Sequence, residues 1–363
     1  MTALREFHAD HGAEFETRGG RELVAHYGRP ARTHEAVRNG VGVVEMHYGV
    51  VVVGGDDRYD YVDNVVSNAV PTADGEGRYA LLLDPQGKVR TDMYVYDAGE
   101  RLLLFVPPSQ AASLAEEWRE KVFIQDVEIR DATDEFAVFG VHGPQSTEKV
   151  ASVLTGAGAP EPPLSFVRGS IGDVGVTAIA SDAPTGEEGY EIVCAAGDAR
   201  DVFDALLFYG NPSVPFGQRT WETLTAEAGT PLFETELAGR IPNVLGIRNA
   251  VDFEKGCFVG QEVVSRVENR GRPSRRLVGL RPERLPEAGA AVFDGDGSVG
   301  DVTRAVDSPS LDVPIALALV DFDAPADLAV RVDGEDVPAP VTSLPFVEGS
   351  DRSARLPTYD GDD

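Results

Sequence analysis

The sequence predicts an α+β fold with a small β-barrel at its C-terminal end, on three observations. A strand, a glycine turn and a helix follow one another at residues 50–66 and again at 136–154. Between these two cassettes, strands with alternating polarity are separated by short turns, which indicates a hairpin meander. Beyond Pro273, about six short β-runs are separated by Gly, Pro and Asp, which is typical of a small antiparallel barrel.

The length and charge of the chain limit what it can be. A chain of 363 residues exceeds one ordinary core and predicts two or three domains. Its 61 Asp and Glu residues outnumber 32 Lys and Arg residues, which gives a net charge of -29 and argues against non-specific binding to nucleic acid or to anionic membranes. Scarce lysine and abundant carboxylate on a chain that is 42% hydrophobic resemble the proteins of salt-loving organisms. A disordered acidic protein is the alternative, but periodic runs of Val, Leu, Phe and Tyr argue against it.

The sequence contains no pattern for a metal site, a disulfide framework or a membrane span. Two cysteines cannot build a disulfide framework or a four-cysteine metal site, although a single bridge between them is possible. The six histidines lack metal-ligand spacing, so we expect no metal. No run of 18 apolar residues occurs and the N-terminus has no apolar leader, so we expect a cytoplasmic protein.

In chain order, the first half contains a short helix, a strand, a capped helix and the meander, and the second half begins with the repeated cassette. The expected elements are a helix and turn at 34–43, strand 50–53, a helix from 57 to 66, strands 79–83, 89–96 and 102–106, a helix at 109–121, strand 136–141, helix 145–154, strand 190–194 and helix 217–229. The order of strand, glycine turn and helix repeats, although the residues themselves do not. This repeat predicts two related α+β halves. The expected barrel strands are 276–280, 290–293, 299–306, 315–320, 328–332 and 337–341, and the polar segment 348–363 is expected to be a disordered acidic tail.

Asp92 is the first candidate for a functional carboxylate. Strand alternation places it on the same face as Arg90 and Tyr94. The alternative is a solvated residue, which is what most strand carboxylates are.

A second candidate is the carboxylate-rich loop 182–191. Glu187, Glu188 and Glu191 lie near two glycines, and carboxylates can accept hydrogen bonds from the N–H edge of a heterocycle such as a pterin. On so acidic a chain, an ordinary charged loop is the alternative.

The octet Lys255-Gly256-Cys257-Phe258-Val259-Gly260-Gln261-Glu262 is the third candidate. Its glycines permit a tight turn around a single thiol, and Lys255 and the helix predicted from Gln261 would both favour the thiolate of Cys257. A thiolate suggests redox, mixed-disulfide or transient metal chemistry. The alternative is a cysteine that packs in a glycine-rich turn.

The octet, followed by Arg266 and by residues 270–280, resembles the motif of the YgfZ-type folate-binding proteins. These are relatives of the glycine cleavage T-protein, an aminomethyltransferase, and the resemblance covers roughly residues 25–345. It implies a three-domain, ring-shaped α+β protein that holds tetrahydrofolate in a central channel. We therefore divide the chain into a first folate-binding half at 1–133, a second half at 134–272 that ends in the octet, and a barrel at 273–347.

The same resemblance implies site residues. The T-protein carries paired aspartates after its Gly-Gly turn, and these positions are Thr91 and Asp92 here. The family's pterin-contacting loop matches residues 186–191, with Glu191 the best match. The helix end 226–229 matches the family's Glu-Ala-Gly, but the arginine expected two residues before Glu227 is Thr225. The resemblance thus implies Asp92 and Cys257 as catalytic residues and the folate-binding set Asp92, Tyr79, Glu187, Glu191, Glu227 and Lys255.

Three functions follow from these residues. The first is a YgfZ-type accessory protein that supports iron–sulfur protein assembly or repair and is linked to tRNA modification. The second is a true aminomethyltransferase that moves a one-carbon unit from a lipoyl-bound aminomethyl group to tetrahydrofolate. The third is a folate-binding module without chemistry. The implied partners are folate together with iron–sulfur assembly factors or a lipoyl carrier protein, without nucleic acid or membrane; whether the chain is an enzyme stays open.

Overall fold

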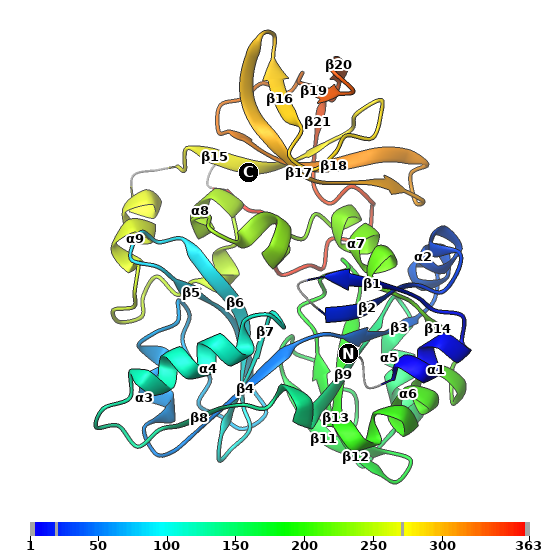
Figure 1. Cartoon of the computed structure of the whole chain (residues 1–363), viewed down its shortest axis with the longest axis vertical. Coiled ribbons are helices and arrows are strands. Elements are labelled where there is room, and N and C mark those ends of the chain that lie inside the picture. Colours follow the sequence, from blue (N-terminus) through cyan, green and yellow to red (C-terminus); the bar gives the residue numbers. More distant parts are fainter. Residues whose placement is uncertain (1–3, 19–20, 270–271, 360–363) are drawn as a thin grey trace.

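The computed structural model describes residues 4–18, 21–269 and 272–359, and Figure 1 shows three lobes around a common centre. Two α/β lobes lie side by side, and a β-rich lobe lies across their upper ends. The α+β class and the β-rich C-terminal lobe are therefore confirmed. Within the described ranges, no helix is both long and apolar enough to cross a bilayer.

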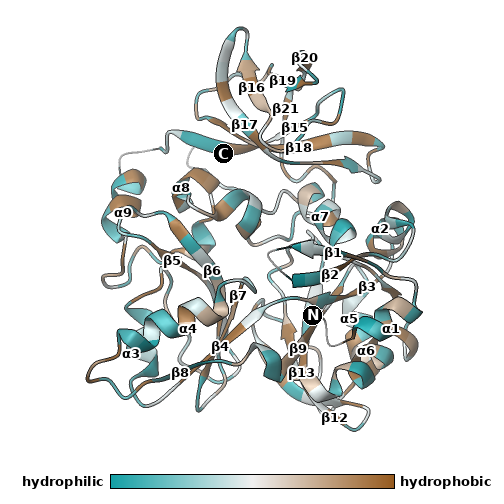
Figure 2. Cartoon of the chain, viewed as in Figure 1, coloured by the Kyte–Doolittle hydropathy of each residue, from teal (hydrophilic) through white to brown (hydrophobic). Residues whose placement is uncertain are grey.

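The first lobe is a five-stranded sheet with two helices. Its strands, in spatial order, are β5 (Gly77–Leu83), β6 (Val89–Asp97), β7 (Leu102–Val106), β4 (Gly49–Gly54) and β8 (Glu128–Asp131). Helices α3 (Arg58–Asp63) and α4 (Ala111–Glu120) contribute Val62, Leu114 and Trp118 to a buried cluster with the sheet. Figure 2 shows hydrophobic residues concentrated on β4 and hydrophilic ones along α3, as expected for a buried strand and a surface helix.

The second lobe is a seven-stranded sheet. Its strands, in spatial order, are β10 (Leu154–Thr155), β11 (Phe166–Ile171), β12 (Val174–Ala180), β13 (Gly189–Ala195), β9 (Phe136–His142), β3 (Gly42–Met46) and β14 (Val214–Pro215). Helices α1 (Arg5–Asp10), α5 (Ser146–Val153) and α6 (Ala199–Phe208) contribute Phe7, Val150 and Phe203 to the buried cluster of this lobe.

The two lobes share one topology, which supports the predicted repeat. The order β5-β6-β7-β4 in the first lobe matches β11-β12-β13-β9 in the second. In both, the strand before the glycine turn pairs with the last strand of the meander that follows. Gly55 and Gly143 end these strands with φ of +94° and +122°, conformations that L side chains rarely adopt.

The C-terminal lobe contains seven strands. They are, in spatial order, β20 (Glu335–Pro338), β19 (Ala329–Val332), β16 (Ala291–Asp294), β17 (Gly297–Ser308), β18 (Val313–Asp321), β15 (Arg275–Leu280) and β21 (Val341–Thr342). The segment 335–342 pairs with β19 at one edge of the sheet and with β15 at the other, so it closes the sheet into a barrel. The single strand predicted at 337–341 is therefore two strands, separated by Ala339 and Pro340.

Several shorter elements connect the lobes. They are the hairpin β1 (Glu14–Arg18) and β2 (Arg21–His26), helices α2 (Pro30–Arg38), α7 (Gln218–Glu227), α8 (Pro242–Leu245) and α9 (Gln261–Asn269), the π-helical turn η3 (Phe233–Leu237), and the 3₁₀ turns Thr133–Glu135, Ala196–Asp198 and Arg248–Ala250. The helix predicted at 34–43 instead begins at Pro30, whose fixed φ suits a first helical position, and ends at Arg38 before β3 begins.

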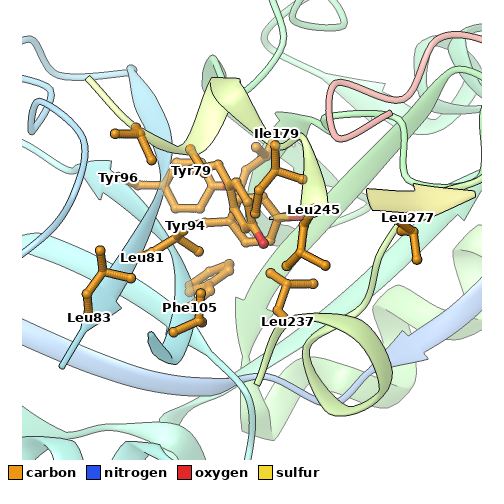
Figure 3. Packing of buried hydrophobic residues seen from close by; sticks show 14 of the residues in the cluster. Tyr79, Leu81, Leu83, Tyr94, Tyr96, Phe105, Ile179, Leu237, Leu245 and Leu277 are labelled. Carbon is orange, nitrogen blue, oxygen red and sulfur yellow. The ribbon is translucent and has the colours of Figure 1, made fainter. Parts of the chain in front are cut away.

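All three lobes contribute to one central core. Figure 3 shows Tyr79, Leu81, Tyr94 and Phe105 from the first sheet close to Ile179 from the second, with Leu237, Leu245 and the barrel residue Leu277 beside them. The lobes are thus joined by continuous apolar packing.

The segment Glu348–Tyr359 is ordered, so the predicted disorder is wrong for these residues; residues 360–363 lie outside the described ranges. Ser350, Ser353 and Arg355 are buried, and Ala354 N–H donates to Asp182 O at 3.0 Å. Polar composition misled the prediction because the segment packs between the lobes through specific polar contacts. The boundaries at 133, 272 and 347 stay predictions, and β3 from the first range pairs with β9 of the second.

Gly55→Ala is expected to lower the free energy of unfolding by about 2–4 kcal/mol, because a strained φ adds to a steric clash. A Cβ at residue 55 would lie 2.1 Å from Asp126 O. Chemical denaturation measures the change. Gly28→Ala is the matched control, since Gly28 has φ of +91° but nothing within 4 Å of its Cβ position; equal losses for the two variants would contradict the predicted clash.

Candidate functional site

A cavity of about 220 Å³ lies where the lobes meet. Its lining comes from β3 and the turn after it, from β6 and β7, from α7 and η3, from the barrel strand β17 and from the C-terminal segment. The residues that carry its chemistry are Tyr48, Asp92, Tyr94, Trp221, Phe233, Arg304 and Arg355. Aromatic walls with a few charged groups are typical of a site for a flat polar ligand.

Asp92 faces this cavity from β6, so the interpretation as a solvated surface residue is wrong. Tyr94 shares this face and is buried, but the predicted shared face is wrong for Arg90: a bulge in the pairing of β6 with β5 skips Arg90, which is exposed and pairs with Glu117 of α4. Tyr79 donates its hydroxyl to Asp92 Oδ2 at 2.8 Å. Burial raises the pKa of Asp92 above its ordinary value, although Arg355 and the Tyr79 hydrogen bond act in the opposite direction. Tyr79 thus orients the carboxyl group, and Thr91 is buried beside it.

Arg355 brings a buried positive charge to the same cavity. Its Nε lies 2.9 Å from Asp182 Oδ2, and its Nη2 donates to the Tyr94 hydroxyl at 3.0 Å. Tyr94 in turn donates to Asp182 Oδ1 at 2.8 Å. The guanidinium carbon lies 5.0 Å from the ring centroid of Tyr79. Burial opposes the charge, but Asp182, Tyr94, Tyr79 and Asp92 together outweigh it and keep the pKa of Arg355 well above its ordinary value.

Glu191 lies behind Tyr48 and does not itself line the cavity. Tyr48 donates its hydroxyl to Glu191 Oε1 at 2.6 Å, and Oε2 is buried without a hydrogen-bond partner among the described residues. Burial raises the pKa of Glu191 to about 7, despite the lowering effect of the Tyr48 hydrogen bond. A carboxyl group of this kind is protonated more readily than an exposed one. Its direct contact with a pterin stays a prediction.

Glu187 and Glu227 lie together, away from the described lining of the cavity. Glu227 is completely buried, and His34 Nε2 and Arg38 Nη2 each lie 2.8 Å from its Oε2. Burial opposes ionisation, but these partners outweigh it and lower the pKa of Glu227 to about 2. Glu187 contacts Arg38 at 3.5 Å, and burial raises the pKa of Glu187. The geometry gives Glu227 a role in joining α2 to α7, and a folate contact for either residue stays a prediction.

The amine of Lys255 donates hydrogen bonds to the backbone of the first lobe. Its Nζ donates to the backbone oxygens of Asp63, Val66 and Asn68 at 2.7, 3.1 and 2.9 Å, and only 5% of its side chain is exposed. A cation at these carbonyls complements the C-terminal end of α3. The amine therefore fastens the octet to the first lobe, and its predicted contact with folate stays a prediction.

Gly260, the residue of the octet directly before α9, packs against the hairpin turn between β5 and β6. A Cβ on Gly260 would lie 2.6 Å from Asp84 O and 3.0 Å from Gly87 Cα, and Gly260 has φ of +83°. Cys257 itself is exposed and does not line the cavity around Asp92. Residues 270–271 of the motif lie outside the described ranges.

Arg355 and Tyr48 were not predicted from the sequence as site residues, and Asp182 was predicted only as the start of the loop 182–191. The signal for Arg355 was the sequence Arg352-Ser353-Ala354-Arg355-Leu356-Pro357, which places arginine beside apolar residues in a segment otherwise rich in acid. A second cavity of about 380 Å³ lies between β6 and β7 and the strands β11, β12 and β13. The described residues that line it include arginines but no carboxylate, so it does not share the chemistry of the first.

Comparison with known proteins identifies the family. Residues 4–255 match the model of the GCVT N-terminal domain, and residues 275–348 match the glycine cleavage T-protein C-terminal barrel domain. This chain belongs to the glycine cleavage T-protein family.

Relatives in this family are named aminomethyltransferases. That of Streptomyces avermitilis is 35% identical over 95% of this chain and 96% of its own length. That of Bacillus subtilis is 30% identical over 95% of this chain and 98% of its own. The crystal structure of the glycine cleavage system aminomethyltransferase T from Bartonella henselae shares the fold, with a TM-score of 0.85 and 24% identity over 96% of this chain and 98% of that one.

These findings confirm the T-protein superfamily and the three-lobed fold expected from it. They do not support the YgfZ-type interpretation, because these relatives carry the aminomethyltransferase name and the octet residues Lys255 and Gly260 have structural contacts that account for them. The iron–sulfur and tRNA-modification roles lose their support with it. The halophilic origin inferred from composition stays a prediction.

Glu191→Gln is expected to gain stability relative to the unmutated protein as pH rises from about 5 to about 8. The pKa of Glu191 is raised from 4.5 to about 7 on folding, so its contribution is complete below 4.5 and is lost as pH rises through 7. The upper limit of this loss is about 3 kcal/mol. Denaturation of both proteins across this pH range measures it.

Glu227→Gln provides the opposite case. The pKa of Glu227 is lowered from 4.5 to about 2, so its contribution is present above 4.5 and is lost as pH falls through 2. The variant should therefore be less stable than the unmutated protein at neutral pH. A pH-independent difference for Glu191→Gln would refute the assignment of a raised pKa.

The two cysteines are expected to differ in reactivity. Cys257 is exposed, whereas Cys194 is 3% exposed and burial raises the pKa of its thiol to about 12. Ellman's reagent should therefore modify one thiol rapidly in the folded protein and two after denaturation. Cys257→Ser should abolish the rapid phase, and a rapid phase that survives this change would contradict the described environment of Cys194.

Proposed function

We propose that this chain is an aminomethyltransferase that transfers the one-carbon unit of a lipoyl-bound aminomethyl group to tetrahydrofolate. The observation that carries the proposal is the carboxyl group of Asp92, which faces the central cavity and is held by the Tyr79 hydroxyl at 2.8 Å. Relatives that share most of their length with this chain bear the name aminomethyltransferase.

The cavity fits a reduced pterin. Tyr94, Phe105, Trp221 and Phe233 supply apolar and aromatic surface for a flat heterocycle. A pterin presents N–H donors along one edge, and Asp92 supplies carboxylate oxygens that accept hydrogen bonds. Tyr48 also lines the cavity, and Glu191 lies directly behind it and accepts its hydroxyl hydrogen bond.

Tetrahydrofolate would supply the nitrogen that accepts the one-carbon unit. Asp92 would act on this substrate in two ways. As a carboxylate it stabilises positive charge that develops on the one-carbon unit, in a site where the surrounding apolar groups strengthen the interaction. Its raised pKa also makes it a better proton acceptor than an exposed aspartate.

Thr91, which stands in place of the first of the family's paired aspartates, is buried in β6. The side chain is 2% exposed and donates to Asp92 O at 3.1 Å. Thr91 lies on the opposite face of β6 from Asp92, so it is not on the face that meets the cavity. The proposed chemistry therefore depends on the single carboxylate that β6 presents to the cavity.

Asp92→Asn is expected to lower kcat by about 10²–10⁴, because the amide can neither accept a proton nor stabilise positive charge as a carboxylate does. The assay is formation of methylene-tetrahydrofolate from aminomethyl-loaded lipoyl carrier protein, at low salt and in molar KCl. Asp97→Asn is the matched control: Asp97 is also buried on β6 and accepts the Tyr59 hydroxyl at 2.7 Å, but it does not line the cavity.

Cys257→Ser distinguishes the proposal from the accessory role that the octet suggests. The aminomethyltransferase needs no thiol at that exposed position, so turnover should be unchanged. Tetrahydrofolate binding by the unmutated protein without any turnover, over both salt conditions, would overturn the proposed function.

A further inference from the structure

A β-bulge in the barrel turns Arg304 toward the central cavity. In the pairing of β17 with β18, Val302 lies opposite Ala318, yet Arg304 lies opposite Leu317, so Thr303 is an extra residue. Val302 and Ala305 both contact the barrel's own core. Regular alternation would place Arg304 on the same face as Val302, inside the barrel, and the bulge instead places it outside.

Arg304 is a buried guanidinium that is only partly satisfied. It is 6% exposed; Nη1 donates to Thr225 Oγ1 at 2.9 Å and Nη2 donates to Thr230 O at 2.7 Å. Its Nε has no hydrogen-bond partner among the described residues. Thr225 stands where the family resemblance leads us to expect an arginine, so a positive charge from the barrel reaches the same place on α7.

Three arginines that line the cavity lie at different distances from carboxylates of the protein. Arg355 lies 2.9 Å from Asp182, and Arg18 lies 2.6 Å from Glu16 and also contacts Glu222. Arg304 instead lies 3.4 Å from Glu236.

The Glu236 oxygen that faces Arg304 already has two closer partners. It accepts hydrogen bonds from Leu232 N–H at 2.9 Å and from the Thr235 hydroxyl at 2.6 Å. Among these three cavity arginines, Arg304 therefore has the weakest pairing with a carboxylate of the protein.

We propose that Arg304 binds a carboxylate of the benzoylglutamate end of tetrahydrofolate, an inference that rests on the proposed function. A guanidinium can only donate, so it suits the anionic end of the ligand, whereas Asp92 suits the pterin edge with its N–H donors. Asp92 lies on the first lobe and Arg304 on the barrel, so the ligand spans the two lobes. Glu45, Glu222 and Glu234 also line the cavity, and their charge makes a dedicated cation necessary for an anionic ligand.

The test compares two ligands that share the reduced pterin ring, of which only one carries the p-aminobenzoylglutamate group. Tetrahydrofolate carries the glutamate, and 6-methyltetrahydropterin has the same ring without it. Arg304→Gln should weaken tetrahydrofolate binding by about 10- to 100-fold, as expected for loss of a charge-assisted hydrogen bond, and leave 6-methyltetrahydropterin binding unchanged. Titration calorimetry under anaerobic conditions measures both, and Arg284→Gln, at an exposed barrel arginine, is the control.

Glu236→Gln serves as a second variant that does not depend on the folding of Arg304→Gln. It removes the competing carboxylate but keeps an oxygen for Leu232 N–H and Thr235, so tetrahydrofolate should bind several-fold more tightly and 6-methyltetrahydropterin as before. Equal weakening of both ligands by Arg304→Gln would assign Arg304 a purely structural role and overturn the inference. Unchanged tetrahydrofolate affinity in both variants would also overturn it, whereas failure of the unmutated protein to bind tetrahydrofolate would refute the proposed function itself.

Discussion

The centre of the molecule depends on the ion pair between the buried guanidinium of Arg355 and Asp182. A guanidinium that is 4% exposed would be very unfavourable without partners, and here Asp182 and two tyrosines compensate it. Asp182 belongs to the second lobe, Tyr79 and Tyr94 belong to the first, and Arg355 arrives from the C-terminal segment. The Arg355–Asp182 ion pair and the tyrosine contacts together join three parts of the chain that are distant in sequence, and Arg355 and Tyr94 line the cavity.

Two buried carboxyl groups of this protein have pKa values that are shifted in opposite directions. Glu191 has a tyrosine hydroxyl as its partner, and its pKa rises to about 7, whereas Glu227 has His34 and Arg38, and its pKa falls to about 2. Burial disfavours the charged form in both cases, and the partners decide the outcome. Asp92 and Glu191, which lie at or directly behind the cavity, both have raised pKa values, as expected at a site for proton transfer; burial also raises the pKa of Glu187, which lies away from the cavity.

The octet around Cys257 shows that an unusual sequence can have structural causes. Lys255 fastens the segment to the end of α3, and Gly260 allows it to approach the hairpin turn at Gly87. The motif suggested thiol chemistry for Cys257, but this thiol is exposed and does not line the cavity. Asp92 and the buried groups around it, and not the thiol, therefore stand at the cavity.

The sequence by itself determined many of the elements and one central site residue. Polarity with a period of two defined β6 and the face that carries Asp92, and glycines at the turns defined the two cassettes, because these signals depend on neighbouring residues alone. The family resemblance then supplied the lobes and the ligand class. Tertiary structure decided the rest: Arg355 acquires its role from burial against Asp182, and Arg304 acquires its direction from a one-residue bulge. Neither effect is visible in local sequence, because burial and register depend on partners that are more than 100 residues away for Arg355 and on the opposing strand for Arg304.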